Sequence, residues 1–114
     1  MAYSVVITPE AERDFELIFD FLADSHVGFG DSADSALKRA LQRTMSMRRD
    51  AASLAKAPHR GTMDPNLGPG RRHVTINRAI FYFETIDARE EVRILAIFFG
   101  GQDHRQQMLR RLLG

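Results

Sequence analysis

Hydrophobic residues recur with two different periods along this chain. In the first half they repeat every three to four residues, which is typical of amphipathic helices. The first stripe predicts a helix over residues 9–25, and it consists of Ala11, Phe15, Ile18 and Leu22, widened by Phe19 and Phe21. The second predicts a helix over residues 32–55, and it consists of Leu37, Ala40, Leu41, Thr44, Met47, Ala51 and Leu54. The short connection between them favours an antiparallel helical hairpin.

Both predicted helices begin with capping signals. Pro9 suits a first helical turn because proline lacks the N–H that would have no helical partner there. Thr8 is then the expected N-cap, and acidic residues at positions 10, 12 and 14 complement the helix dipole. Asp31 or Ser32 should cap the second helix.

The rest of the chain has the pattern of β-strands. Four β-rich runs are bounded by polar breaks, at residues 3–8, 73–76, 79–86 and 92–99. Residues 57–70 hold three of the four prolines and three of the eight glycines, so they are expected to form a loop. The last three runs predict an antiparallel meander. The isolated first strand should pair with the last one, because a lone strand is unstable.

These elements predict an α+β fold with the order β-α-α-β-β-β. The N-terminal helical hairpin should pack on one face of a small, mostly antiparallel sheet. The run over 79–86 is apolar on both faces, which is typical of a central strand, and the run over 92–99 should also be interior. With 114 residues, the chain is expected to form one domain over residues 1–114.

Composition excludes several kinds of site. The chain has no cysteine, so disulfides and thiolate metal sites are excluded. No histidine or carboxylate group has the spacing of a metal site, and no glycine-rich phosphate loop is present, so we expect neither a metal nor a cofactor. No apolar run is long enough to span a membrane, and the start lacks a signal-peptide pattern, which indicates a cytoplasmic protein.

A net charge of +1 conceals a strong asymmetry. Residues 1–34 carry eight acids and one base, whereas residues 35–64 carry seven bases and two acids. From residue 71 onward there are eight arginines and five acids. Opposite charges should help the two helices to pack side by side. The basic second half leaves a surface that suits nucleic acid or an acidic peptide.

Short motifs, in this order, resemble those of the RelE/ParE superfamily of bacterial toxins over nearly the whole chain. YSVVITPEAERDFELIFDFLA resembles the family's first strand and helix, with Thr8, Ala11 and Asp14 in its T-x-x-A-x-x-D pattern. Residues 58–61 resemble its P-x-x-G loop, and Arg72 followed by AIFYF resembles its Arg and I-x-Y strand. RILAIFFGGQDHR resembles its final strand and basic exit. The long second helix and the ITPEAERD start are more similar to the ParE branch.

The resemblance implies the toxin of a type II toxin–antitoxin module, of the plasmid stabilisation type, held inactive by an antitoxin from the same operon. ParE-like members act on DNA gyrase, and RelE-like members cut mRNA on the ribosome. The ParE-like features favour gyrase as the target. The antitoxin is expected on the apolar surface of the hairpin or, as a second choice, along an exposed sheet edge. The expected hairpin residues are Phe19, Leu22, Leu37 and Leu41.

A ribonuclease is the alternative function. Such an enzyme needs a base for the ribose 2′-OH, cations for the phosphate and an acid for the leaving oxygen. The expected residues are Arg72, His104 and Arg105. RelE-like nucleases resemble one another in having several Lys and Arg along the sheet and an aromatic or His residue near the C-terminus. This chain departs from that pattern, because it has no lysine after Lys56 and residues 106–114 contain neither tyrosine nor histidine. We therefore expect an inhibitor rather than an enzyme.

Target binding is expected at the basic ends of the meander and in the C-terminal segment, at Arg71, Arg72, His73, Arg105, Arg110 and Arg111. Residues 105–113 place Met and Leu against Arg at helical spacing, which predicts a short basic amphipathic helix or tail. This segment either docks on the chain's own sheet or stays loose enough to contact a target. A third hypothesis is an α+β binding module without toxicity, whose basic face has no function.

Overall fold

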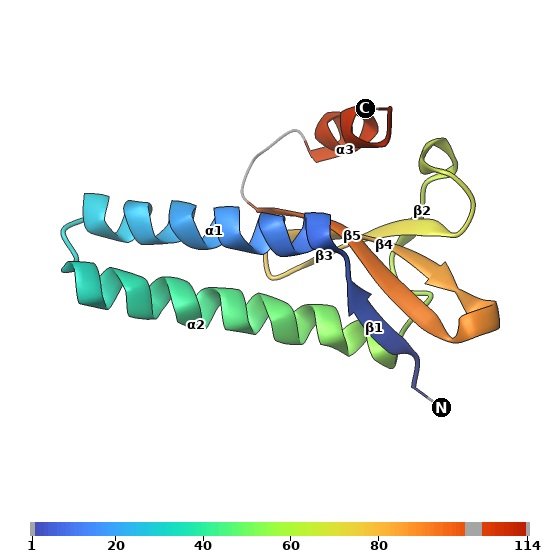
Figure 1. Cartoon of the computed structure of the whole chain (residues 1–114), viewed down its shortest axis with the longest axis horizontal. Coiled ribbons are helices and arrows are strands. Elements are labelled where there is room, and N and C mark those ends of the chain that lie inside the picture. Colours follow the sequence, from blue (N-terminus) through green and yellow to red (C-terminus); the bar gives the residue numbers. More distant parts are fainter. Residues whose placement is uncertain (1, 100–103, 114) are drawn as a thin grey trace.

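The computed structural model describes residues 2–99 and 104–113 of the chain. Its helices are α1 (Pro9–Gly28), α2 (Ala33–Ala52) and α3 (His104–Leu113). Its strands are β1 (Ser4–Ile7), β2 (Thr62–Met63), β3 (Arg71–Ile76), β4 (Ala79–Ile86) and β5 (Glu91–Phe99). Figure 1 shows α1 and α2 as a long hairpin that projects from one end of the sheet, with α3 as a separate short helix. The α+β class is confirmed.

Capping side chains begin both helices of the hairpin, as predicted. Thr8 accepts a hydrogen bond from Ala11 N, and Ser32, rather than Asp31, caps α2 by accepting one from Ser35 N. The first helix runs to Gly28 instead of ending at residue 25, because α2 packs along it and stabilises its last turn. The second helix ends at residue 52, and residues 53–55 continue as a 3-10 turn.

The sheet has five strands in the order β1-β5-β4-β3-β2. β1 pairs with β5 in parallel, which confirms the expected partner of the first strand, and the other three pairs are antiparallel. The expected loop over residues 57–70 is wrong in part, because Thr62 and Met63 form the edge strand β2 against His73 and Arg72. Two residues are too few to give a periodic signal. Their pairing also explains why β3 begins at Arg71 rather than at residue 73.

The turn into β2 requires a glycine at position 61. Gly61 has a φ of +87°, and a Cβ atom there would lie 2.3 Å from the carbonyl oxygen of His73. Any other residue would therefore be strained and would push the edge strand away from β3. The backbone conformation and the close approach of β3 thus explain why the P-x-x-G segment has a glycine at this position.

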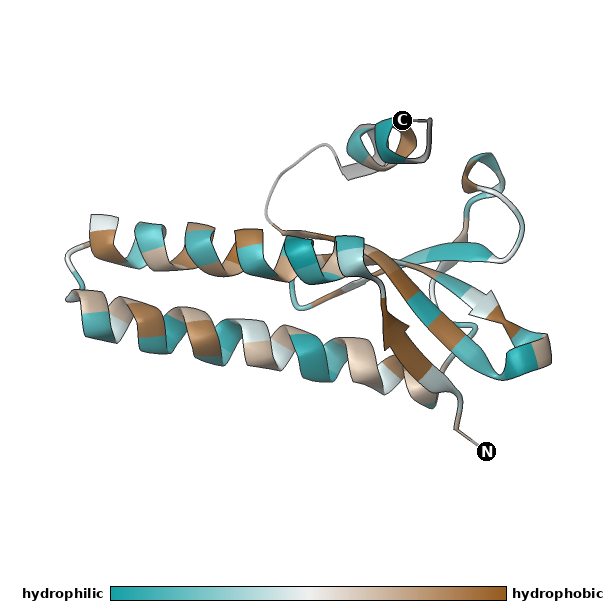
Figure 2. Cartoon of the chain, viewed as in Figure 1, coloured by the Kyte–Doolittle hydropathy of each residue, from teal (hydrophilic) through white to brown (hydrophobic). Residues whose placement is uncertain are grey.

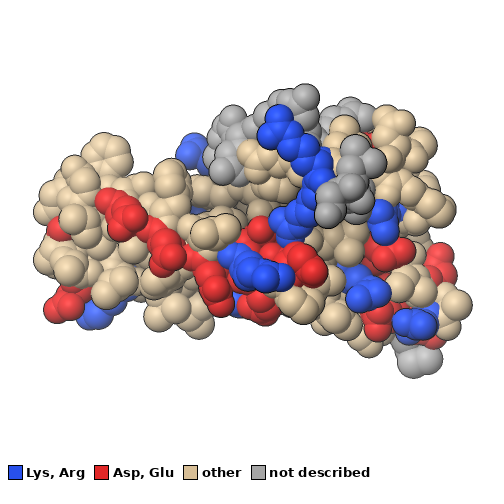
Figure 3. All heavy atoms as spheres, turned by 45° about the horizontal axis from the view of Figure 1, so that its top comes forward, with Lys and Arg blue, Asp and Glu red and all other residues tan. Residues whose placement is uncertain are grey.

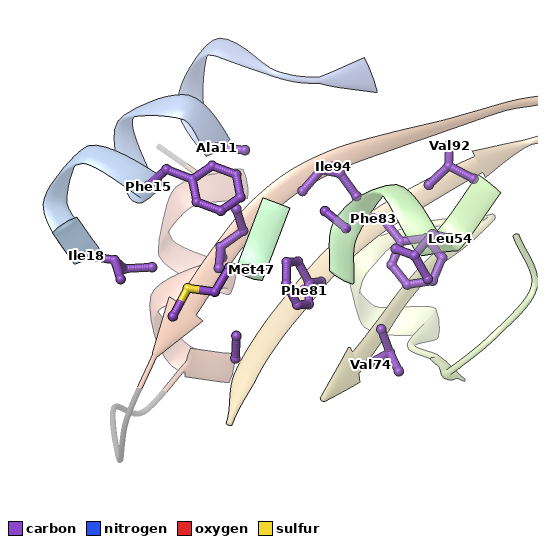
Figure 4. Packing of buried hydrophobic residues seen from close by; sticks show 13 residues of the cluster. Ala11, Phe15, Ile18, Met47, Leu54, Val74, Phe81, Phe83, Val92 and Ile94 are labelled. Carbon is purple, nitrogen blue, oxygen red and sulfur yellow. The ribbon is translucent and has the colours of Figure 1, made fainter. Parts of the chain in front are cut away.

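The main hydrophobic core lies between the hairpin and one face of the sheet. In Figure 4, Phe15 of α1 and Met47 of α2 point toward Phe81, Phe83 and Ile94 of the central strands. Figure 2 shows the corresponding hydrophobic character of β1 and of much of β5. The expected arrangement, a helical hairpin packed on one face of a small sheet, is confirmed.

A second, smaller core lies on the opposite face of the sheet. Tyr82, Ala96 and Phe98 belong to this cluster, because residues that alternate along a strand point to opposite faces. Met108 of α3 is 1% exposed and packs against them together with Leu67. The C-terminal segment is thus a helix docked on the chain's own sheet, which is one of the two alternatives that the sequence left open. Among the helices that the structure describes, none has the length and apolar character needed to cross a bilayer.

Candidate functional site

The residues of the T-x-x-A-x-x-D pattern join the start of α1 to β5. Thr8 Oγ1 donates a hydrogen bond to the carbonyl oxygen of Ile94 at 2.7 Å and accepts one from Ala11 N at 3.3 Å. Ala11 is fully buried, so a larger side chain would have no room. Asp14, about one turn further along α1, accepts a hydrogen bond from Ile97 N at 2.9 Å. The pattern is therefore structural, because each of its residues fixes α1 on the sheet.

An irregularity in β5 explains why Asp14 and Arg111 meet. The β4–β5 register shifts between Tyr82 and Phe83, which leaves Leu95 without a partner on β4. Arg111 Nη2 donates to the carbonyl oxygen of Leu95 at 3.0 Å, and both terminal nitrogens of Arg111 donate to the Asp14 carboxylate at 3.0 Å. The Arg111 and Asp14 side chains are 27% and 12% exposed, so water screens this pair less than it screens a surface pair. Arg111 therefore fastens α3 to both α1 and β5.

The basic residues at the start of β3 also have partners within the fold. Arg71 Nη1 donates to the carbonyl oxygen of Leu67 at 2.8 Å, and Arg72 Nη1 donates to that of His59 at 2.9 Å. The His73 ring packs against the Tyr82 ring, with their centroids 5.4 Å apart. The two arginines thus hold the segment between α2 and β3 on the sheet.

The remaining basic residues predicted as a site lie on α3. Arg110 is exposed there and is open to a partner. Of the three residues predicted for a nuclease, Arg72 has a described side chain, whereas the side chains of His104 and Arg105 lie outside the described part of the chain. Within residues 2–99 and 104–113, no three His, Asp or Glu side chains are grouped so that they could hold a metal ion.

A cluster that the sequence did not indicate joins the N-terminus, the loop after α2 and the turn before β5. Tyr3 Oη donates to Asp87 Oδ1 at 2.8 Å, and His59 Nε2 lies 2.7 Å from the same oxygen. The hydrogen bonds from Tyr3 and His59, together with the nearby charge of Arg72, lower the pKa of Asp87. The same hydrogen bond to Asp87 raises the pKa of Tyr3. Tyr3 and Asp87 lie 84 positions apart, so no local sequence pattern could have revealed this cluster.

The hairpin carries a groove of about 420 Å³ between α1 and α2. We define this hairpin groove by its lining residues, Phe15, Glu16, Phe19, Asp20, Leu41, Thr44, Met45 and Arg48. Arg48 donates two hydrogen bonds to the Glu12 carboxylate, at 3.0 and 2.7 Å, and its guanidinium carbon lies 4.2 Å from the centre of the Phe15 ring. This pair joins the acidic first helix to the basic second helix, as the charge pattern predicted. The groove brings together Phe19 and Leu41, two of the four residues predicted to bind an antitoxin.

The other two predicted antitoxin residues lie outside this groove. Leu37 is about one helical turn from Leu41 on the same side of α2 and is 48% exposed. Leu22 packs against the main core and lines a separate hollow with Arg39 and Arg43. The predicted set is therefore divided, because Phe19 and Leu41 line the hairpin groove, Leu22 lines the second hollow, and Leu37 belongs to neither lining.

Large hydrophobic side chains are exposed from the middle of α1 onward and just after it. Phe29 is 90% exposed, Leu17 67% and Phe21 60%. The prediction that Phe21 widens the core stripe is wrong, because Phe21 lies about one turn from Leu17 on the outer side of the helix. Figure 3 shows acidic side chains in a row along this part of the hairpin, while Lys and Arg gather near the sheet and α3.

Comparison with known proteins finds similarity in structure. No family model matches the sequence, and no curated protein has significant sequence similarity to it. A chain of the RelBE2 toxin–antitoxin complex from Mycobacterium tuberculosis has a TM-score of 0.63 at 15% identity, covering 90% of this chain and 95% of that one. A chain of the chromosomal ParDE toxin–antitoxin system from Pseudomonas aeruginosa has a TM-score of 0.63 at 20% identity, covering 88% of this chain and 98% of that one. A mutant of the Escherichia coli toxin RelE in the free state has a TM-score of 0.61 at 8% identity, covering 97% of each chain.

The chain has the RelE/ParE toxin fold. The likeness spans almost the whole of each compared chain, so it concerns the complete arrangement of hairpin and sheet rather than one motif. The resemblance of the short sequence motifs is thus confirmed at the level of the fold. RelE and ParE structures have this same fold, and a fold alone does not determine a function, so the fold does not choose between the two branches.

Proposed function

We propose that this chain is the toxin of a type II toxin–antitoxin module, and that it inhibits DNA gyrase in the cytoplasm until a cognate antitoxin binds it. One observation carries the proposal. The RelE/ParE fold extends over 90% and 88% of this chain in the comparisons with the RelBE2 and ParDE toxin–antitoxin systems.

Inhibition by binding is favoured over RNA cleavage because several of the predicted arginines are already bonded within the fold. A metal-independent nuclease needs cations that are free to stabilise the phosphate in the transition state. Arg71 and Arg72 instead donate to backbone carbonyl oxygens, and Arg111 is paired with Asp14. These contacts occupy donors that a phosphate would need, and the charge of Arg111 is balanced by Asp14. A binding toxin, by contrast, needs a surface rather than a proton relay. We place target contacts at the predicted basic residues, among which Arg110 is exposed.

The antitoxin is proposed to bind the hairpin groove as an amphipathic helix. The apolar rings and chains of Phe19, Leu41 and Met45 line this groove, and Leu37 extends it along α2. Helices that dock in such grooves insert apolar anchors every three or four residues, which suits the spacing of these side chains. Leu41→Glu should therefore abolish copurification of the antitoxin, whereas Met63→Glu on the edge strand β2 should leave it intact.

Expression in a bacterial host tests the toxin function. Induction of this chain alone should stop growth, and coexpression of the small protein encoded beside it should restore growth. Normal growth on induction of the free chain would contradict both the gyrase and the ribosome hypotheses, and would favour the non-toxic binding module.

A second assay separates the two targets. Inhibition of gyrase predicts loss of DNA supercoiling activity with intact mRNA, whereas the nuclease alternative predicts mRNA cut on ribosomes. If toxicity survives both Arg72→Ala and His104→Ala, these two residues are not catalytic. Loss of mRNA cleavage and of toxicity in both variants would show instead that they belong to a nuclease site.

A further inference from the structure

Hydrophobic side chains that belong to neither core are exposed from the middle of α1 to the end of the hairpin. Leu17, Phe21, Val27 and Phe29 are 67%, 60%, 50% and 90% exposed, and none of them belongs to either hydrophobic core of the described residues. They lie within about three helical turns of one another. We call these four residues, with Asp20 and Asp24, the tip surface.

Such a group is typical of an interaction site. Single exposed apolar residues are ordinary on a protein surface, but a local group with two aromatic rings is not. Aromatic side chains often contribute most of the binding energy at protein interfaces, because each buries a large apolar area when a partner covers it. Phe21 and Phe29 are therefore the expected anchors of the tip surface.

The charge on α1 around these anchors is negative, whereas the neighbouring helix α2 carries Arg39 and Arg43 beside Leu22. Residues 14–37 contain six acids and no lysine or arginine. Asp31 lies 3.7 Å from His26 and 3.5 Å from Arg39, whereas Asp20 and Asp24 are exposed on α1 among the apolar side chains. Figure 3 shows this row of carboxylates running toward the end of the hairpin.

The negative charge and the exposed apolar area together indicate which class of partner the tip surface can bind. Carboxylates repel the phosphates of nucleic acid and of anionic membranes, so neither suits this surface. A protein surface with lysines and arginines around an apolar recess would complement it in both respects. Surfaces of that charge are typical of proteins that hold DNA or RNA.

We propose that the tip surface is a further contact of this toxin with its target, beside the basic residues at the sheet end, and that it covers a basic, nucleic-acid-binding surface of that target protein. The inference rests on the proposed function and adds the contact surface and the chemistry of the partner. Phe21 and Phe29 enter the apolar recess, and Asp20 and Asp24 pair with the surrounding cations. The hairpin projects from the sheet, so its end reaches a recess without contact from the sheet itself (Figure 1).

The apolar residues of the tip surface are separate from the hairpin groove, although Asp20 belongs to both. Phe19 and Leu41 face the space between α1 and α2, whereas Leu17 and Phe21 lie on the outer side of α1. Binding of the antitoxin and binding of the target are therefore expected to respond to different substitutions of apolar residues.

Purified proteins test the proposal. The chain and its variants Phe21→Ser/Phe29→Ser and Asp20→Asn/Asp24→Asn are compared in binding to DNA gyrase and to ribosomes, and in growth arrest on induction. Met63→Ser is the control for an apolar residue, since it is 50% exposed on the distant strand β2. Glu90→Gln, exposed at the turn before β5, is the control for an acid. Circular dichroism confirms that each variant is folded.

The double phenylalanine variant should lose at least about tenfold in affinity for the target and should no longer stop growth. The double asparagine variant should lose affinity at low salt, with a smaller difference at high salt, and double-stranded DNA should compete with the wild-type chain. The two control variants should bind as the wild type does.

Each other outcome has its own consequence. If the wild type binds gyrase and stops growth, and the phenylalanine variant does so equally, the tip surface is not the contact, although the proposed function stands. If the phenylalanine variant loses the antitoxin instead of the target, or if it changes a wild-type dimer into a monomer, the surface belongs to that other partner. Tip-dependent binding to ribosomes supports the surface and contradicts gyrase as the target. A wild-type chain that binds neither and leaves growth normal overturns both proposals.

Discussion

The sheet end and the hairpin end of this molecule use their polar and apolar side chains in opposite ways. At the sheet end, charged side chains join distant segments, since Arg111 binds Asp14 and Arg72 binds the backbone of the loop after α2. At the hairpin end, Phe21 and Phe29 face the solvent among carboxylates. Charged residues that resemble a site in the sequence can thus hold segments of the fold together, whereas exposed apolar residues identify a surface that is available to a partner.

Removal of the Asp14 carboxylate should have the largest effect on stability. Asp14→Ala leaves the partly buried Arg111 without its counter-charge and Ile97 N without its acceptor. A loss of roughly 2–3 kcal/mol in the free energy of unfolding is expected, because uncompensated groups of this kind keep their desolvation cost. Urea unfolding measures this loss. Asp24→Ala, at an exposed position of the same helix, should change stability by less than about 0.5 kcal/mol. Equal losses in the two variants would show that the ion-paired Asp14 stabilises the fold no more than the exposed Asp24 does.

The edge of the sheet should be sensitive to a single methyl group. Gly61→Ala would place a Cβ atom against the His73 carbonyl oxygen in a left-handed conformation, so a loss of about 2 kcal/mol is expected. Gly28→Ala at the end of α1 meets open space and should stabilise the protein by about 0.5 kcal/mol. Thermal unfolding of both variants checks the contrast, which a stabilising Gly61→Ala would contradict.

The Arg48–Glu12 ion pair between the two helices should contribute less to stability than the Asp14–Arg111 pair, and its contribution should depend on pH. The Arg48 and Glu12 side chains are 41% and 44% exposed, so Arg48→Met should cost only about 0.5 kcal/mol at neutral pH. The hydrogen bonds from Arg48 lower the pKa of Glu12 from its ordinary value of 4.5. The stabilisation is therefore complete above that value and is lost as the pH falls through the lowered pKa of the folded state. Urea midpoints of wild type and variant should converge in acid, and a constant difference would show that Arg48 acts through the Phe15 ring instead.

The smallest effect on stability is expected at the tip surface. Phe21→Ser/Phe29→Ser should change the free energy of unfolding by less than about 0.5 kcal/mol per residue, because both side chains are already exposed. Phe15→Ala, which removes a ring of the main core that is 2% exposed, should cost roughly 3 kcal/mol in the same assay. Comparable losses in the two variants would mean that the hairpin end is packed, and the comparison of the two regions would fail.

Much of the fold could be predicted because its signals are local. Apolar spacing identified the hairpin and the meander, and Thr8 and Ser32 mark helix starts through bonds to residues three positions away. β2 was missed because two residues have no period. Phe21 was misplaced because the sequence cannot show which of two neighbouring aromatic residues turns toward α2.

The candidate site was less predictable for the same reason. Phe19 and Leu41 do share one groove, as the spacing of apolar residues suggested. The partners of the basic residues lie far away along the chain, with 97 positions between Asp14 and Arg111. The sequence could therefore name these arginines but not show which of them the fold already uses.

By itself, the sequence determined the α+β class and the order of most elements, which depend on apolar periodicity and on capping and turn residues that act over a few positions. It also predicted the pairing of the first strand with the last, because a lone strand is unstable. Only the tertiary structure decided that α3 covers the second face of the sheet, that Asp14 and Arg111 complete the irregular part of β5, and that Phe21 and Phe29 stay in solvent. Each of these depends on which distant groups meet, because burial and ion pairing are properties of the packed chain rather than of any segment.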